Sequence, residues 1–309
     1  MQITLAQPHP RLVCLGLSAF DLTWLVDDLP QGTGKTRALD LQLGGGGMAA
    51  NAAVAAARLG ASVQFWGRAG EDNAGRTMHE ELAAQGVDVS YFRLFAQARS
   101  SVSGIMVDAS GERMIVNFRG ADLPGDTNWL PLPAVAGFDA VLADPRWPEG
   151  ALALFRAARK HGIPTVLDAD VAEDAVFEAL LPHTDYAVFS EPGLAGYAAS
   201  AAGPEDRLRY ARGHGCSLAA VTLGERGVVW DDGHAIDRLP ALPVHVVDTT
   251  GAGDVFHGAL AFALGARIPA REALRFSTAV AALKCTSAGG RAGAPDLAAV
   301  MSFMHDFEE

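Results

Sequence analysis

The residues best suited to catalysis lie in one short stretch, Asp248-Thr-Thr-Gly-Ala-Gly-Asp254. It follows the β-branched run 244–247 and precedes the apolar segment 255–264, an order that predicts a strand, a glycine turn and a helix. The first amides of a helix have no internal partner and carry partial positive charge. Because Gly251 and Gly253 have no side chains, an anion can approach these amides closely.

Asp254 closes this stretch and is the candidate base. Beside the positive end of the predicted helix, its carboxylate is expected to stay ionised at neutral pH and to accept a proton from an incoming hydroxyl. An anion-binding turn next to a base is suited to moving a phosphoryl group onto an alcohol. On the pattern alone, the alternative is an ordinary glycine turn in which Asp254 only caps the helix.

Composition limits the partners of the chain. With 309 residues, half of them hydrophobic, the chain can bury a large core and carry a smaller attachment. A formal net charge of −12 argues against nucleic acid or an anionic membrane as a partner. Cys14, Cys216 and Cys285 are far apart and odd in number, as in cytoplasmic proteins with reduced thiols. No signal peptide or membrane-spanning run is visible, so we expect a cytoplasmic protein.

The hydrophobic pattern predicts an α/β fold over residues 11–309, with residues 1–10 as a loose tail. The continuous apolar run 12–17 predicts a central parallel strand. Beyond residue 138, strand-like and helical segments alternate, which predicts a doubly wound, mainly parallel sheet. The predicted strands are 140–143, 165–168, 186–189 and 219–223, and the predicted helices between them are 150–161, 171–181 and 205–215.

Four further strand-like segments fit poorly into a parallel sheet, because they have turn residues between them and interrupt the alternation of strands and helices. They are 22–26, 36–43, 101–107 and 113–118. We expect them to form a small, mostly antiparallel sheet, made by about 22–43 and 101–119, that lies over the edge of the main sheet as a lid. A lid would keep water away from a phosphoryl group in transfer.

Polar residues follow the predicted strands, at the sheet edge where open α/β sheets bind ligands. Asp21 follows the first strand, and the pattern leaves open whether it binds a ligand or only turns the chain. Four glycines, Gly44 to Gly47, precede Asn51 and an alanine-rich helix, and they are either a ligand-binding turn or a flexible hinge. Other strand ends bring to this edge Asp144, Arg146, Asp168, Asp170, Ser190, Glu191 and Thr222.

The stretch Asp248–Asp254, followed by Phe256 and Gly258, resembles the C-terminal signature of the ribokinase-like (phosphofructokinase-B) carbohydrate kinases. Gly46-Gly47-x-x-Ala50-Asn51 resembles their N-terminal signature. The resemblance implies a ribokinase-like fold in which Asp254 is the catalytic base. It also implies the roles of three sets of residues: Gly251, Ala252 and Gly253 as the anion hole; Asp21, Gly46, Gly47 and Asn51 on the sugar hydroxyls; and Thr222, Gly224, Gly227, Gly253 and Lys284 at the nucleotide.

The resemblance also implies ATP with Mg²⁺, and a monovalent cation such as K⁺ held by Asp248 and Thr250. Many relatives carry Asn-x-x-Glu for magnesium, whereas this chain has Ser190-Glu191-Pro192-Gly193. Glu191 and Asp168 are therefore the candidates for the magnesium site. The family pattern further implies a homodimer formed through the lid.

Lys35, Asn117 and Arg146, with the strings around them, resemble the 6-deoxy-6-sulfofructose kinases of this family. The resemblance implies that these three side chains hold the sulfonate and that the C1 hydroxyl receives the γ-phosphoryl group. A sulfonate is a monoanion with three acceptor oxygens, which suits one arginine and one ammonium group. The alternatives are fructose-6-phosphate or tagatose-6-phosphate, a neutral sugar such as fructose or ribose, a nucleoside, or a sugar-binding regulator without catalytic activity.

Overall fold

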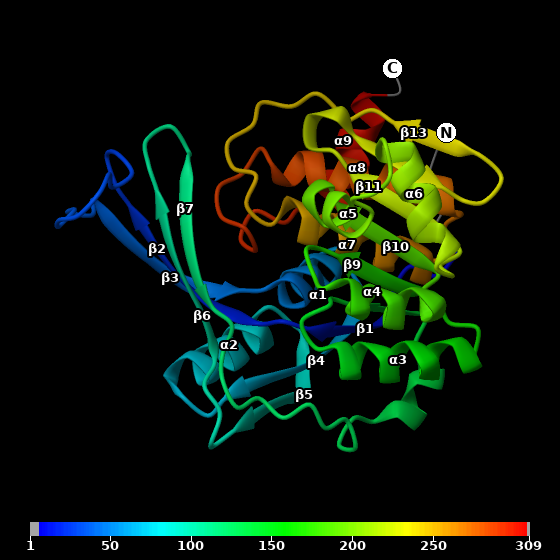
Figure 1. The fold of residues 1–309 in the computed structure, drawn as a ribbon, viewed down its shortest axis with the longest axis horizontal. Helices are drawn as coiled ribbons and strands as arrows, with labels where there is room; N and C mark the ends of the chain where they lie inside the picture. The colour runs from blue at the N-terminus through cyan, green and yellow to red at the C-terminus, as the bar shows by residue number, and fades with distance from the viewer. Residues whose placement is uncertain (1–5, 308–309) are drawn as a thin grey trace.

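The computed structural model describes residues 6–307 and contains two sheets (Figure 1). The larger has nine strands in the order β13-β12-β11-β10-β9-β8-β1-β4-β5. All neighbours are parallel except β11-β12 and β12-β13, so the predicted doubly wound, mainly parallel sheet is confirmed. Its strands are β1 (Arg11–Gly16), β4 (Ser62–Gly70), β5 (Asp88–Phe95), β8 (Ala140–Ala143), β9 (Thr165–Ala169), β10 (Tyr186–Ser190), β11 (Leu218–Thr222), β12 (Val228–Asp231) and β13 (Ile236–Leu239).

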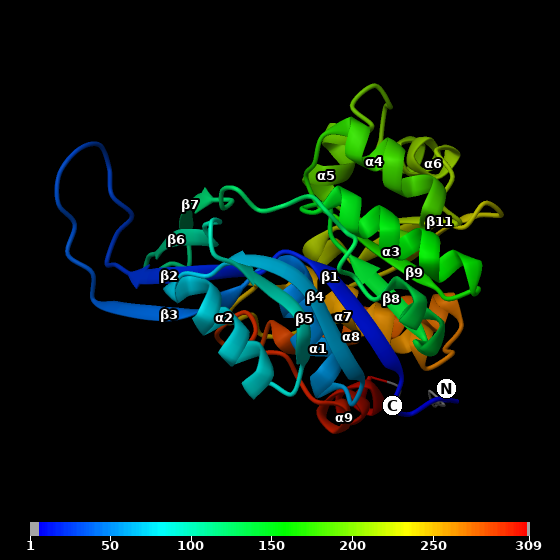
Figure 2. The ribbon, with the colours of Figure 1, turned by 90° about the horizontal axis from the view of Figure 1, so that it is seen from below.

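Helices cover both faces of this sheet (Figure 2). One face carries α1 (Met48–Arg58), α2 (Asn73–Ala84), α7 (Ala252–Gly265), α8 (Ala270–Lys284) and α9 (Leu297–Asp306). The other carries α3 (Pro148–Lys160), α4 (Asp174–Leu180), α5 (Glu191–Tyr197) and α6 (Pro204–Gly213). Side chains of β1 alternate between the two cores, with Leu12 and Cys14 on one side and Val13 and Leu15 on the other. This two-sided burial explains why the strand is a continuous apolar run.

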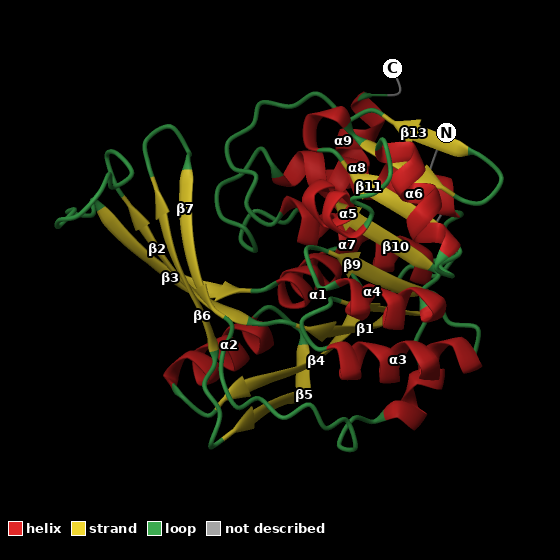
Figure 3. Cartoon of the chain, viewed as in Figure 1, coloured by secondary structure: helices red, strands yellow, loops and turns green. Residues whose placement is uncertain are grey.

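The smaller sheet is the predicted lid, and it projects from the body of the molecule (Figure 3). Its order is β3-β2-β6-β7, with β2 (Ala19–Leu25), β3 (Asp40–Gly46), β6 (Ser101–Val107) and β7 (Arg113–Phe118). The outer pairs are antiparallel, and β2 pairs with β6 in parallel. Since β1 is followed almost directly by β2, the chain passes from the centre of the main sheet straight into the lid.

Some predicted elements are wrong. Residues 244–247 form an irregular segment instead of a strand, because the amides of Val247 and Asp248 donate to the carbonyl of Cys285 at 2.8 and 3.2 Å. The strand predicted at 36–43 is also displaced, because β3 spans Asp40–Gly46, where it pairs with β2. In both cases the observed structure depends on hydrogen-bond partners distant in sequence, which a local sequence pattern does not reveal.

Within the predicted tail, residues 1–5 lie outside the described part of the chain. Two of the following residues are bound to the body: the amide of Gln7 donates to Ala266 O at 3.3 Å, and His9 Nδ1 lies 3.1 Å from Gly60 O. Across residues 6–307, none of the helices has the length and apolar character needed to cross a membrane.

Candidate active site

A cavity of about 650 Å³ lies where the lid meets the carboxyl edge of the main sheet. The lid contributes Asp21 and Asn117, helix α1 contributes Asn51, and helix α7 contributes Asp254. The glycine turns before α1 and α7 also reach it. Residues from both ends of the chain therefore line one space, at the sheet edge where α/β proteins bind ligands.

Asp254 lies in the first turn of α7, behind the glycine turn that the sequence singled out. Gly251 precedes the helix with φ 71°, a conformation that favours glycine. Asp254 Oδ2 accepts a hydrogen bond from Asn51 Nδ2 at 2.7 Å. Burial and the neighbouring Asp168 raise the pKa of Asp254 to about 7, against the opposite effects of Asn51 and His257. The expectation that the helix end keeps this group fully ionised at neutral pH is therefore wrong, although a base with such a pKa is well matched to neutral pH.

The turn before α7 has the features of an anion-binding site. Ala252, Gly253 and Asp254 form the first helical turn, where amides have no partner within the helix. The amide of Ala252 lies 3.2 Å from Thr249 O, which closes the turn. A side chain at Gly253 would meet nothing within 4 Å, so this side of the turn is open to a ligand.

Three polar side chains form a row across the lid strands above the cavity. The pairing register aligns Asp21 on β2 with Ser103 on β6, and Ser103 with Asn117 on β7. Asn117 Nδ2 donates to Ser103 Oγ at 3.1 Å. Burial raises the pKa of Asp21, while Ser103 and the charge of Arg291 act to lower it. A Cβ atom on Gly46 would lie 2.0 Å from Asp21 Oδ2, so a side chain there would displace the Asp21 carboxylate.

Arg291 was not among the site residues predicted from the sequence. It packs against the start of α1: its Nε donates to Asn51 Oδ1 and its Nη2 to Gly46 O, both at 3.1 Å. Burial lowers the pKa of this arginine to about 10, against the effects of nearby carboxylates. Arg291 and Asp254 thus occupy both ends of the Asn51 amide, which therefore positions the base instead of pointing freely at a sugar.

The predicted anion-binding trio is only partly assembled. Arg146 lines the cavity, where its Nη2 lies 3.0 Å from Asp170 Oδ2 and its Nη1 bonds Val171 O at 2.7 Å. Asn117 lines it from the lid. Lys35 does not, because it lies in the exposed loop between β2 and β3, outside the cavity. This placement corrects the prediction for Lys35.

Two arginines that the sequence analysis did not select line the same cavity, Arg68 and Arg119. The guanidinium of Arg68 lies 4.2 Å from the ring centroid of Trp147, and its Nη1 donates to Pro124 O at 2.5 Å. In sequence these residues look like surface arginines, and only the fold places them beside Arg146.

The predicted nucleotide residues divide into two groups. Thr222 ends β11, and Gly224 and Gly227 follow at the same sheet edge, outside the cavity. A Cβ atom on Gly227 would lie 2.0 Å from Leu239 O, so glycine is required there. Lys284, in contrast, is completely buried, and its Nζ donates to Asp248 O at 2.8 Å. It is bound to the catalytic loop and does not face a nucleotide, which corrects that prediction.

The predicted monovalent cation site is already occupied by groups of the protein. The Asp248 carboxylate accepts hydrogen bonds from the amide and hydroxyl of Thr250 and from the amide of Gly289, at 2.6 to 2.8 Å. Lys284 Nζ lies 3.9 Å from the same carboxylate. Burial acts to raise the pKa of Asp248, but these partners lower it overall. With donors and an ammonium group around the carboxylate, Asp248 and Thr250 do not fit a K⁺ site.

The two predicted magnesium ligands do not converge. Asp168 is buried on the face covered by α7, where its Oδ2 lies 3.4 Å from His257 Nδ1. Glu191 is exposed at the start of α5, and both its carboxylate oxygens accept from Arg226 at 2.6 Å. Asp168 and Glu191 therefore do not form one magnesium site in this arrangement.

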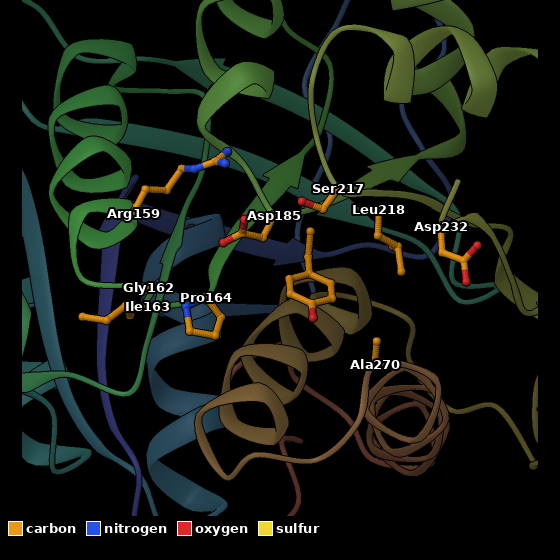
Figure 4. A pocket seen from close by; sticks show the side chains of 10 residues that line it. Arg159, Gly162, Ile163, Pro164, Asp185, Ser217, Leu218, Asp232 and Ala270 are labelled. Carbon is orange, nitrogen blue, oxygen red and sulfur yellow. The ribbon is translucent and has the colours of Figure 1, made fainter. Parts of the chain in front are cut away.

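A second cavity, of about 500 Å³, lies at the opposite edge of the sheet, near the first residues of β9, β10 and β11 (Figure 4). Its polar groups are engaged in the fold: Arg159 donates to Pro182 O at 3.0 Å, and Asp185 accepts from the amide and hydroxyl of Thr165. The catalytic turn lies at the other edge, so we take the larger cavity as the active site.

Comparison with known proteins agrees with this geometry. Residues 9–297 match the family described as pfkB family carbohydrate kinase. The ribokinase of Bacillus subtilis is 32% identical over 289 residues, which are 92% of this chain and 96% of that protein. A crystal structure from Agrobacterium tumefaciens matches with a TM-score of 0.91 at 36% identity, covering 97% of this chain and 99% of that one. Arabidopsis thaliana ribokinase complexed with ribose and ATP matches with a TM-score of 0.85 at 27% identity, covering 96% and 99%. The chain belongs to the pfkB family of carbohydrate kinases, which transfer a phosphoryl group to an alcohol.

Proposed function

We propose that this kinase phosphorylates the C1 hydroxyl of a ketohexose with an anionic group at C6, and that the sugar is 6-deoxy-6-sulfofructose. The observation that carries the proposal is the presence of Arg68, Arg119 and Arg146 around one cavity of a protein with net charge −12. Of the three, Arg146 already pairs with Asp170, and a neutral sugar would bring no further negative charge to this cluster. A sulfonate offers three acceptor oxygens and a permanent charge to the guanidinium groups.

The proposed reaction follows from the placement of the side chains. The sugar lies under the lid, with Asp21 on its hydroxyls and Asn117 and the arginines at C6. Its C1 hydroxyl faces Asp254, which accepts the proton as the C1 oxygen bonds to the γ-phosphorus of MgATP, while the bond from that phosphorus to the bridging oxygen breaks and ADP leaves. The amides of the turn before α7 stabilise charge on the phosphoryl group in transfer.

Ribose is the second candidate, and a specific observation favours it. The Bacillus ribokinase aligns along nearly the whole chain, and the Arabidopsis enzyme contains ribose and ATP in a very similar fold. A ribose has no anionic group, however, so it would not contact the three arginines through a charge. The two candidates therefore differ in whether substrate binding depends on the charge of Arg146.

A coupled kinase assay with five sugars distinguishes the candidates. It compares 6-deoxy-6-sulfofructose, fructose-6-phosphate, tagatose-6-phosphate, fructose and ribose. We expect the highest kcat/KM for the sulfonated sugar. The proposal is contradicted if ribose has the higher kcat/KM, or if none of the five sugars supports ATP turnover.

The variant Arg146→Ala sharpens this assay. We expect its KM for the sulfonated sugar to rise about tenfold or more, since one charge-assisted contact is lost, while the KM for fructose changes little. The matched control is Arg159→Ala, which removes an arginine at the opposite sheet edge. Equal effects of Arg146→Ala on both sugars would exclude a role for this residue at the anionic end.

We also propose that the enzyme forms a homodimer through the lid. The lid exposes an unusual number of large apolar side chains, and apolar patches of this kind mark protein interfaces. They are Leu39, Leu41, Leu43, Met114, Ile115, Val116 and Phe118. Light scattering should give twice the chain mass for the native protein and the chain mass for Leu43→Lys. A monomer at all concentrations would exclude the dimer.

A further inference from the structure

His257 follows Asp254 in α7, and both of its ring nitrogens face hydrogen-bond acceptors. It is buried in α7, one turn after Gly253. Its Nδ1 lies 2.6 Å from Gly253 O and 3.4 Å from Asp168 Oδ2, and its Nε2 lies 3.1 Å from Val188 O. Gly253 belongs to the anion-binding turn, so the ring links this turn to strands β9 and β10.

The hydrogen-bond geometry indicates the protonation state of this ring. A neutral imidazole has one N–H, and here it would leave the lone pair of its other nitrogen against a carbonyl oxygen. An imidazolium donates from both nitrogens and satisfies both carbonyls. Burial lowers the pKa of His257 overall, although Val188 O, Asp254 and Gly253 O act to raise it. Geometry nevertheless favours the charged ring: Nδ1 and Nε2 each lie within hydrogen-bond distance of a carbonyl oxygen, and only an imidazolium can donate to both.

Asp168 supplies the matching negative charge. Its Oδ2 is buried and makes no hydrogen bond within residues 6–307, and His257 Nδ1 lies 3.4 Å from it. Burial and the carboxylates of Asp144 and Asp170 raise the pKa of Asp168 well above its usual value, against the effect of Arg146. An isolated carboxylate there would be costly, whereas a carboxylate paired with an imidazolium is compensated.

The other charges around the base have their own partners. Asp144 accepts from the amides of Leu17, Ala49 and Arg146. Asp170 is held by Arg146 and Ser190. On the cationic side, Lys284 binds Asp248, and Arg291 binds Asn51 and Gly46. This leaves Asp168 and His257 as the pair behind Asp254.

We propose that His257 is a positioning residue, held as an imidazolium between Asp168 and the Gly253 carbonyl, that favours the carboxylate form of Asp254 and holds its turn in place. It does not touch the substrate. Its positive charge stabilises the carboxylate form of the base, and its bond to Gly253 O fixes the turn that presents the amides. The proposal requires only the carbohydrate kinase activity of the family and is independent of which sugar is phosphorylated.

The first test observes the ring directly and needs no sugar. In protein labelled with ¹⁵N-histidine, His257→Gln identifies the resonances of His257. We expect both ring nitrogens to be protonated at pH 7.5 in the native enzyme, and only one in Asp168→Asn, where the counter-charge is removed. A ring with a single protonated nitrogen in the native enzyme at pH 7.5 would overturn the proposal, whatever the substrate assays give.

The second test is the pH profile of kcat/KM with the best sugar of the panel. Loss of the positive charge in His257→Gln should raise the pKa of Asp254. The acid limb of the kcat/KM profile should therefore shift to higher pH by about one unit. Ser277→Ala, which removes a buried hydroxyl bond within α8, should change stability but leave the limb in place. Superimposable profiles for His257→Gln and the native enzyme would exclude the electrostatic role. If His257→Gln does not fold, His257→Asn replaces it in both tests.

Discussion

The catalytic turn and the lid line the same cavity, but they are built in different ways. The turn before α7 is surrounded by the fold, and Asn51, His257, Lys284 and Arg291 hold it through buried contacts. The lid is a thin sheet whose strand β7 is exposed along its whole length. This contrast indicates that the turn before α7 is held more rigidly than the lid.

One side chain bridges the two regions. Arg113, on lid strand β7, donates from Nη1 to Thr250 Oγ1 at 2.6 Å and from Nη2 to Thr249 Oγ1 at 2.7 Å. Thr250 Oγ1 in turn donates to the Asp248 carboxylate at 2.6 Å. Arg113 therefore connects the lid directly to the turn before α7.

The largest effect is expected in the preorganised region. Asp254→Asn removes the proton acceptor but keeps the shape of the site, so kcat should fall by about 10³-fold or more. ATP affinity, measured by calorimetry, should change little because the amides of the turn remain. A variant with nearly native kcat would show that another group takes the proton.

A smaller effect is expected where the lid meets the core. Arg113→Ala should lower kcat/KM by about tenfold and raise ATP hydrolysis without sugar, because the lid no longer closes on the turn. The control is Arg37→Ala, an exposed lid arginine outside the cavity. If Arg113→Ala and Arg37→Ala behave alike, the bridge has no part in lid closure.

The smallest effect is expected on thermal stability, which should depend on pH through Asp254 in α7 but not through a lid carboxylate. The pKa of Asp254 is about 7 in the folded protein against an ordinary value of 3.8, so its stability contribution is complete below pH 4 and is lost as pH rises through 7. Asp254→Asn cannot ionise and should therefore melt several degrees higher than the native protein at pH 8. The difference should vanish near pH 4. The control is Asp40→Asn, which replaces an exposed lid carboxylate and should give no such pH-dependent change in melting temperature. If the melting temperature of Asp254→Asn differs from that of the native protein by the same amount at pH 4 and pH 8, the raised pKa is contradicted.

Local patterns predicted much of the fold. Strands β6, β7 and β8 begin and end at the predicted residues, because each is a short β-rich run between clear turn residues. The glycine turn before α7 was also predictable, since its composition admits few other structures. The segment 244–247 has equally strong β propensity, but it has no neighbouring strand to pair with and binds Cys285 O instead.

The site was less predictable than the fold, because burial decides what a charged side chain does. Lys35 and Lys284 are both lysines near glycine-rich strings, yet one is exposed on a loop and the other is completely buried. Arg68 and Arg291 became recognisable only once contacts between distant segments were known. Nothing in the local sequence distinguishes these residues from ordinary surface cations.

The buried ammonium group of Lys284 has a consequence for the conditions under which the enzyme works. A cation that is part of the polypeptide cannot dissociate, compete with sodium or be diluted when a cell loses potassium. The catalytic loop would then keep its geometry through osmotic shock, and turnover would be the same in potassium and choline buffers.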